Sequence, residues 1–420
     1  MRLKFYLIPL MLMMVMNLLM SCSNRDKKPV GPKRLTYLDQ QYGSRFEAFT
    51  GRLLLLPEEE RDSVVKEFIL AFPQTPVIEA DSIVSLYWYG RANTVVLNGD
   101  LQHGWTVPDT LDTIACNGFT FFHRTFTLPI DARIDYLLAI DSVTMTDERN
   151  PVVTPGGYGP HSQIAMPGFQ PDPIRNFRED IAHGILDSIW LMSRNTSVAS
   201  RMAKIYIPAG YDTLSELPVL YVTDGNEAVE FMQYTTVLDN LLADGMIEPL
   251  LVVFLPPSQQ HAEYIGGGEA DFIQAVCNDF VPMVDRMYKT ASLPAKRAIA
   301  GISSGGHAAL LTVLSRPDVF LMGVGQSPTI SEMIYKAFGK LEEKGSDLPA
   351  FRIWIDVGKF DLVGGTINGK TFLEANTDLH HELERRGINH VFNVYNDGHQ
   401  WANWRERTDK VLVYLFGKGK

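Results

Sequence analysis

The feature that most constrains this chain is the decapeptide at residues 298–307, Ala-Ile-Ala-Gly-Ile-Ser-Ser-Gly-Gly-His. Its first three residues predict a strand, its G-x-S-x-G pentapeptide a sharp turn, and the residues up to 314 a helix. Glycine is favoured beside the serine because a Cβ there would clash with neighbouring backbone. Such a turn holds the Ser303 hydroxyl above helix N–H groups that suit the charge developed in acyl transfer. A Gly/Ser-rich turn without chemistry has the same pattern, so the rest of the chain must decide.

A carboxylate in the right position follows the serine along the chain. A serine becomes a nucleophile when a base takes its proton and an acid holds that base, and in α/β-hydrolases the chain order is Ser, Asp/Glu, His. Asp361 comes just past a predicted strand at residues 353–357, where a loop can direct its carboxylate into a site. Asp356 is the competitor, but it lies within the strand. We therefore favour Asp361, although a turn or N-cap aspartate would look the same.

A histidine follows in the same way. His399 lies just past a predicted strand at residues 391–395, next to Gly398. The order, the loop position and the Gly-His-x-Trp setting favour a catalytic base over a surface residue. His307 competes, but it lies on the helix after Ser303, where we expect it to pack. His261 precedes a Gly-rich stretch and could line the cleft.

The oxyanion of an acyl-transfer intermediate needs two N–H donors. One is expected from the backbone of Ser304, the residue after the nucleophile. The other is expected from the loop after the strand that ends at Thr223, which makes it Gly225 or Asn226.

Residues 189–420 alternate strands and helices, which predicts an α/β domain with a mostly parallel sheet buried on both faces. The predicted strands are near-continuous apolar runs at 203–208, 218–223, 250–255, 321–326, 353–357 and 391–395, and the clearest helices are 237–243 and 272–288.

Residues 35–170 predict a smaller domain of a different kind. Residues 35–76 look helical, and a helix starts well at Pro57 with three acids behind it. Short strands follow up to residue 166, which suggests a β-sandwich. This part resembles the Ig-like, early-set sandwich domain that precedes the hydrolase in enterochelin esterases. The motifs are Leu-Tyr-Trp-Tyr-Gly at 86–90, Leu-Asn-Gly-Asp at 97–100 and Asp-Glu-Arg-Asn-Pro at 147–151.

Two tryptophans and one Gly/Pro-rich stretch complete this part. Trp88 and Trp105 could stack on a sugar or an aromatic ring, and we favour packing for both. Residues 154–173 predict a linking loop, and residues 171–188 are taken as the linker between the two domains.

The first 34 residues resemble a bacterial lipoprotein leader. A basic start, an apolar run at residues 5–20 and Leu-Met-Ser-Cys make residues 1–22 a signal peptide, with Cys22 as the lipidated residue. The alternatives are an ordinary signal peptide or a retained anchor. Residues 23–34 predict a polar tether. We expect an exported protein held on a bacterial membrane by a lipid, with the outer membrane favoured and its face left open.

Charge and cysteines exclude other classes. The net charge of −11 over 420 residues, without a basic stripe, argues against nucleic acid as a partner. Cys116 and Cys277 could pair in an exported protein, but two isolated thiols are more often simply buried. There is no Cys-x-x-Cys and no Cys/His cluster, so we expect no metal site.

Residues from about 201 to 416 resemble the putative-esterase family of α/β-hydrolases, which includes enterochelin esterases, S-formylglutathione hydrolases, feruloyl and acetylxylan esterases, and mycolyltransferases. The motifs are residues 218–225, 263–264, 300–306, 358–361 and 398–404. The family's triad falls on Ser303, Asp361 and His399, and the resemblance implies substrate contacts at His261, Tyr264 and Trp401. Many relatives carry an arginine three residues before the Glu-Tyr pair, where this chain has Gln260.

The expected function is that of a serine esterase without metal or organic cofactor. By analogy, its substrate is an acyl or feruloyl ester of a polysaccharide. A siderophore trilactone is the main alternative, and Gln260 weakens it because a catecholate iron complex would favour basic contacts. An acyltransferase and a non-catalytic glycan-binding lipoprotein remain open.

Overall fold

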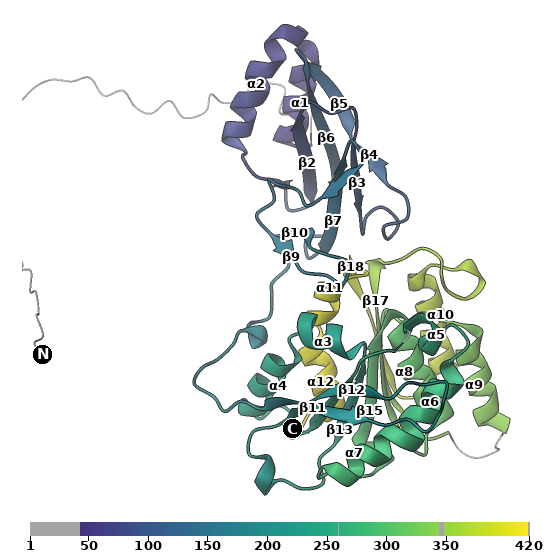
Figure 1. Ribbon diagram of the computed structural model, residues 1–420. Coiled ribbons are helices and arrows are strands. Elements are labelled where there is room, and N and C mark those ends of the chain that lie inside the picture. Colours follow the sequence, from purple (N-terminus) through teal and green to yellow (C-terminus); the bar gives the residue numbers. More distant parts are fainter. Residues whose placement is uncertain (1–42, 259, 344–347, 419–420) are drawn as a thin grey trace, which may run out of the picture.

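The computed structural model describes residues 43–258, 260–343 and 348–418 and has two lobes (Figure 1). We call residues 43–168 the sandwich lobe and residues 185–418 the α/β lobe. The predicted signal peptide, Cys22 and the tether lie outside the described residues. Within the described residues, no helix has both the length and the apolar character needed to cross a bilayer.

The sandwich lobe contains two antiparallel sheets that share an apolar core. The alternating burial of the third strand, with Val95 and Leu97 inward, is typical of a strand that packs on one face. One sheet has the order β1 (Val77–Glu79), β2 (Ile83–Gly90), β6 (Phe119–Thr127), β5 (Asp112–Cys116). The other has the order β4 (Asp109–Thr110), β3 (Val95–Gly99), β7 (Arg133–Ile140), β10 (His161–Ala165), β9 (Val153–Thr154), and β8 (Val143–Met145) also pairs with β7.

Two helices cover the outer face of the first sheet. α1 (Arg45–Leu55) begins at Ser44, whose side chain accepts the Glu47 N–H, and α2 (Glu58–Ala71) begins after Pro57 as the sequence predicts. Phe46 and Phe68 of these helices pack against Tyr87 and Phe121 of the sheet, in an aromatic cluster separate from the sandwich core.

The α/β lobe is built on one eight-stranded sheet, which confirms the predicted fold class. Two neighbouring pairs at one edge are antiparallel, the first strand with the second and the second with the third, and all other neighbours are parallel. The order is β11 (Ile185–Leu191), β12 (Arg201–Ile207), β14 (Leu251–Leu255), β13 (Val219–Thr223), β15 (Arg297–Ile302), β16 (Met322–Gln326), β17 (Arg352–Phe360), β18 (His390–Gly398).

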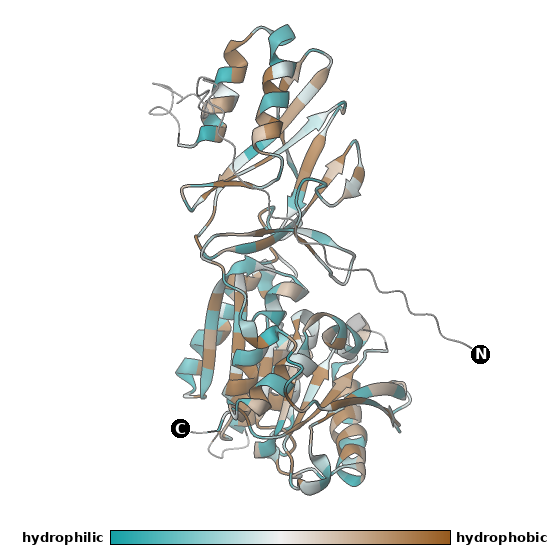
Figure 2. Cartoon of the chain, turned by 90° about the vertical axis from the view of Figure 1, so that its left-hand side faces the viewer, coloured by the Kyte–Doolittle hydropathy of each residue, from teal (hydrophilic) through white to brown (hydrophobic). Residues whose placement is uncertain are grey.

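Helices bury both faces of this sheet, as the apolar strands require. Figure 2 shows hydrophobic strands between the helices. One face packs on α3 (Gly225–Phe231), α4 (Tyr234–Ala243), α11 (Trp401–Arg405) and α12 (Thr408–Phe416). The other packs on α5 (Gln260–Tyr264), α6 (Glu269–Ala275), α7 (Val281–Met287), α8 (Ser303–Ser315), α9 (Glu332–Glu343) and α10 (Phe372–Arg385). The helix predicted at 272–288 is interrupted by a π-helical turn, Val276–Phe280.

Two expectations about the middle of the chain are wrong. The loop predicted at residues 154–173 contains β10, which pairs with β7, and the flanking Gly and Pro residues hide this strand in the sequence. The boundary predicted at residue 189 falls inside β11. This strand lies at the edge of the sheet and exposes its first four residues, so it lacks the apolar run of its neighbours. Cys116 and Cys277 are buried free thiols, as expected for isolated cysteines.

Candidate active site

The nucleophile turn joins β15 to α8 directly, because Ile302 ends the strand and Ser303 begins the helix. Ser303 has φ 48°, a left-handed conformation that costs energy for a residue with a side chain. Gly301 and Gly305 allow this turn. A Cβ on Gly301 would collide with the Gly305 carbonyl, and a Cβ on Gly305 would collide with the Thr223 side chain.

The structure brings Ser303, His399 and Asp361 into one hydrogen-bonded row. His399 Nδ1 donates to Asp361 Oδ1 over 2.7 Å, which leaves Nε2 of the neutral ring as the acceptor for the Ser303 hydroxyl, 2.9 Å away. Asp361 directly follows β17 and His399 directly follows β18. Because parallel strands end at the same edge of a sheet, these loops meet beside the turn after β15.

The carboxylate of Asp361 is held on both oxygens. Oδ1 also accepts the Leu362 N–H at 2.7 Å, and Oδ2 accepts the Ser327 hydroxyl at 2.6 Å. Burial alone raises the pKa of Asp361, but His399 and these hydrogen bonds outweigh it and hold the pKa below its usual value. Asp361 therefore stays ionised at neutral pH.

Sequence reasoning missed Ser327. It directly follows β16, so it stands at the same edge of the sheet as the other site residues, and that position is the signal that could have found it. Trp404 Nε1 donates to Ser327 Oγ at 3.2 Å. The rings of Trp404 and Phe372 also pack against His399 at 4.9 and 5.0 Å between centroids, both nearly perpendicular to it. These contacts fix the orientation of the imidazole.

The two competing residues lie elsewhere. Asp356 is buried within β17, where it accepts from Trp354 Nε1 and Arg407, each at 2.6 Å. His307 is fully buried on α8 with Nδ1 3.1 Å from the Thr329 carbonyl oxygen, and burial lowers its pKa. His307 packs there, as expected.

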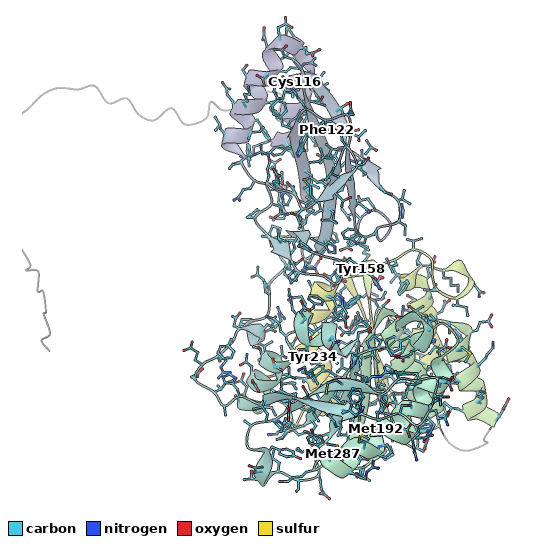
Figure 3. All side chains as sticks on the ribbon, in the orientation of Figure 1. Cys116, Phe122, Tyr158, Met192, Tyr234 and Met287 are labelled. Atoms are coloured by element: carbon cyan, nitrogen blue, oxygen red, sulfur yellow. The ribbon has the colours of Figure 1, made fainter. Side chains whose placement is uncertain are left out.

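A cavity of about 510 Å³ opens on Ser303 and His399 between the two lobes. Among the described residues, its lining contains no lysine and no arginine. The sandwich lobe contributes Trp105, Leu137, Gly157, Tyr158 and His161, and the α/β lobe contributes Asp224, Ile302, Ser303, Ser304, Leu362, His399, Gln400, Trp401 and Trp404. Figure 3 shows Tyr158 at the junction of the lobes.

The predicted oxyanion and substrate residues divide into two groups. Ser304 and Trp401 line the cavity. Gly225 and Asn226 are not among the residues that line it, although Asp224 of the same turn is, and their role as a backbone N–H donor stays a prediction.

The other two predicted substrate residues are Tyr264 and His261. Tyr264 is fully buried, and its hydroxyl accepts the N–H of Asp224, a lining residue, at 3.3 Å. His261 lies in α5, and its side chain is outside the described part of the chain.

The two sandwich-lobe tryptophans also differ. Trp88 packs on Phe122 of the sandwich core, as expected. Trp105 packs beside His161, with Nε1 donating to Asp100 at 2.7 Å, and it also lines the cavity.

The sandwich lobe contacts the two loops that carry Asp361 and His399. Asp100 packs on Gly398, where a Cβ would collide with its carboxylate, and Gly104 lies against the backbone of Leu362. Arg133 donates to Asn403 Oδ1, and Asn403 Nδ2 donates to the Gly398 carbonyl oxygen at 2.9 Å. The positions of Asp361 and His399 therefore depend on both lobes.

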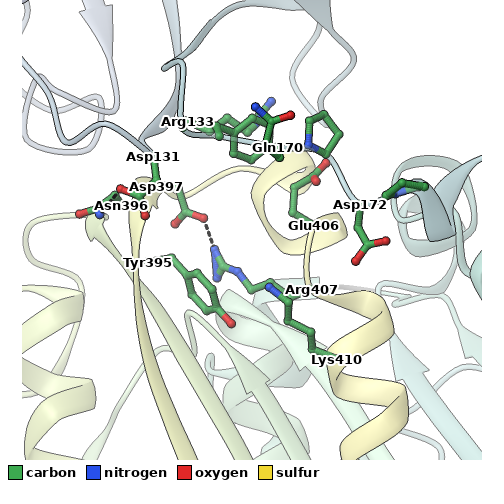
Figure 4. A pocket seen from close by; sticks show the side chains of 14 residues that line it. Asp131, Arg133, Gln170, Asp172, Tyr395, Asn396, Asp397, Glu406, Arg407 and Lys410 are labelled. Carbon is green, nitrogen blue, oxygen red and sulfur yellow. Dashed lines mark hydrogen bonds and ion pairs between the residues drawn. The ribbon is translucent and has the colours of Figure 1, made fainter. Parts of the chain in front are cut away.

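A second cavity, of about 440 Å³, lies beside the linker (Figure 4). Arg407 at its base pairs with Asp397 and Asp356. Burial raises the pKa of Asp397 to about 6 against the effect of Arg407. The triad residues do not line this cavity.

Comparisons with known proteins agree with this architecture. A family model described as putative esterase matches residues 196–414, just over half of the chain. An Endo-1,4-beta-xylanase/feruloyl esterase of Xylanibacter ruminicola is 29% identical over 254 residues, which are 57% of this chain and 32% of that protein. The chain thus spans about a third of the length of that relative.

An Iron(III) salmochelin esterase of Escherichia coli is 22% identical over 218 residues, which are 49% of this chain and 52% of that protein. The enterobactin esterase of Shigella flexneri has the same fold, with a TM-score of 0.63 and 20% identity over 81% of this chain and 94% of the other.

Proposed function

Because this chain belongs to the putative esterase family, we propose that it is a carboxylic ester hydrolase that cleaves its ester through an acyl-enzyme on Ser303. The observation that carries this proposal is the continuous row from Ser303 through His399 to Asp361, which opens on the cavity.

The chemistry follows from that row. Ser303 Oγ attacks the ester carbonyl carbon while His399 Nε2 takes its proton, and the C–O bond to the alcohol breaks as His399 returns the proton to the leaving oxygen. Water repeats the sequence on the acyl-enzyme and releases the acid. Asp361 stabilises the imidazolium, and the backbone N–H of Ser304 is one proposed donor to the oxyanion. No step requires a metal or an organic cofactor.

For the substrate, we propose an acyl or feruloyl ester of a polysaccharide. Flat side chains, among them Trp105, Tyr158 and Trp401, line the cavity and suit a planar aromatic acid. Among the described residues, the lining has no lysine and no arginine, which fits a neutral ester better than an anionic catecholate complex.

We also propose that Cys22 anchors the protein to a bacterial membrane through a lipid. Labelled fatty acid should be incorporated into the wild-type protein and not into Cys22→Ala. Equal labelling of both proteins would contradict this proposal.

The test is hydrolysis of p-nitrophenyl acetate, methyl ferulate, feruloylated xylan and enterobactin by wild type, Ser303→Ala and Ser315→Ala. Ser315 is exposed at the end of the same helix and serves as the matched control. We expect feruloyl turnover that falls at least ~10³-fold only in Ser303→Ala. Preferred cleavage of enterobactin would replace the substrate proposal. Turnover that survives in Ser303→Ala, or no turnover by any of the proteins, would overturn the acyl-enzyme proposal.

A further inference from the structure

A group of metal-ligand side chains lies on α10, away from the ester site. His380, His381 and Glu384 each offer a ligand atom, and these atoms lie within 4.8 Å of one another. The spacing i, i+1, i+4 places Glu384 next to both histidines on the helix surface. His381 and Glu384 are exposed, and His380 is one-quarter exposed.

The hydrogen bonds of His380 fix which of its nitrogens carries the proton. His390, at the start of β18, must donate from Nδ1 to the Ile388 carbonyl oxygen 2.8 Å away, since a carbonyl only accepts. Nε2 of neutral His390 is then an acceptor, and His380 Nδ1 donates to it at 2.8 Å. This leaves the lone pair of His380 on Nε2, the nitrogen that lies 3.7 Å from Glu384 Oε2.

We propose that His380 Nε2, His381 and Glu384 form a binding site for a divalent transition metal ion of the zinc type. Two imidazoles and one carboxylate, with water in the fourth position, are a donor set that zinc takes in proteins. A metal-binding histidine commonly donates its other N–H to a fixed acceptor, as His380 does to His390.

The distances require only side-chain adjustment. Bonds of about 2.1 Å in a tetrahedron place the ligand atoms about 3.4 Å apart. All present separations are within 4.8 Å, so none must close by more than roughly 1.4 Å, and His380 Nε2 and Glu384 Oε2 are already 3.7 Å apart. His381 and Glu384 can make that movement because they are exposed, while the ring of His380 is held by its stack on Phe392 at 4.7 Å.

The position of the site implies a structural role. His390 begins β18 and His399 follows the end of this nine-residue strand, about 30 Å away at the usual rise per residue. A metal ion on His380 would strengthen the link from α10 through His390 to β18 and would stabilise the folded lobe. The expectation of no metal site rested on the absence of cysteine motifs, and this His-His-x-x-Glu set contains no cysteine.

The test is titration of the tag-free full chain with zinc chloride, followed by calorimetry and by the melting temperature. The probe variant is the double substitution His381→Ala/Glu384→Gln, since both residues are exposed. The matched control is His103→Ala, an exposed histidine of the sandwich lobe. We expect saturable binding by wild type and by the control, a raised melting temperature in both, and affinity at least ~10-fold weaker in the double variant.

Two results would overturn the proposal. One is the same zinc affinity and stoichiometry in wild type and the double variant, and the other is no saturable binding by wild type. Turnover of p-nitrophenyl acetate by the zinc-free double variant should equal that of wild type, which separates this test from that of the ester site.

Discussion

Ser327 holds the one oxygen of Asp361 that His399 does not use. We expect Ser327→Ala to lower kcat about 10-fold, because a hydrogen bond to a charged group is worth about 1.5 kcal/mol or more. KM should change little, since Ser327 does not line the cavity. Steady-state kinetics with Ser315→Ala as the control would measure this, and an unchanged kcat would show that Ser327 does not position Asp361.

Asp397 gives a pH-dependent prediction. Because burial raises its pKa to about 6, the folded protein holds this proton more tightly than the unfolded chain between about pH 4 and pH 6. The contribution of Asp397 to the free energy of unfolding must then fall as pH rises through that window.

The difference in unfolding free energy, wild type minus Asp397→Asn, should therefore fall by about 2 kcal/mol between pH 4 and pH 7. Urea denaturation at several pH values measures it. Asp131→Asn, an exposed residue on the same cavity, is the control. A difference that stays flat or rises would refute the raised pKa.

The sequence was informative for residues whose position a single strand determines. Asp361 and His399 could be predicted because each follows an apolar strand directly and in the family's order. Ser327 and the pair His380–His390 could not, because their roles depend on which strands are neighbours and on hydrogen bonds between elements. The second oxyanion donor, Gly225 or Asn226, stays a prediction, because it is a backbone N–H of the turn after β13 and side-chain identity does not reveal it.

At the scale of elements, the loop after β3 contacts the loop that carries Asp361, and catalysis should depend on this contact. Gly104 has φ +59°, and a Cβ there would lie 2.6 Å from Leu362 Cα and 2.8 Å from the Asp361 carbonyl oxygen. Gly118 has φ +80° in the same lobe, with no atom within 4 Å of such a Cβ. An alanine at either position therefore has a strained backbone conformation, and only the alanine at 104 also collides with its neighbours.

We expect Gly104→Ala to lower kcat on p-nitrophenyl acetate at least ~10-fold, because small displacements of a catalytic group are costly. Gly118→Ala should keep its kcat while losing similar stability from strain. Melting temperatures recorded beside the kinetics separate the two effects. Equal kcat values in both variants would contradict a role for this contact.

Most elements could be predicted from periodicity, including α2, β2, β6 and the parallel strands. The sequence did not predict two strands, because each has little apolar periodicity of its own and forms by pairing with a neighbouring strand. β10 is short and lies between Gly/Pro-rich segments, and β11 is an exposed edge strand. The π-helical turn before α7 has no signal that we identified in the sequence.

At the scale of the whole molecule, the ester cavity belongs to both lobes. Tyr158 is 97% exposed and lines this cavity, so its removal should not affect folding. We expect Tyr158→Ala to raise KM for methyl ferulate about 3- to 10-fold, with less effect on p-nitrophenyl acetate, because an aromatic contact is worth about 0.5–1.5 kcal/mol.

Leu55→Ala, also exposed but on α1, is the control for Tyr158→Ala. The same KM for methyl ferulate in all three proteins would show that the sandwich lobe does not contact the acid. The sequence predicted both domains but not their shared cavity, because a contact between lobes leaves no periodic pattern in either.

The measurement that tests the central claim most directly is labelling with a fluorophosphonate, followed by peptide mapping. The serine oxygen replaces fluoride on phosphorus, so the adduct reports an activated hydroxyl whatever the natural ester is. We predict one adduct, on Ser303, absent from Ser303→Ala and formed at least ~10²-fold more slowly in His399→Ala. No adduct in wild type, an adduct on another residue, or an unchanged rate in His399→Ala would contradict the proposed site.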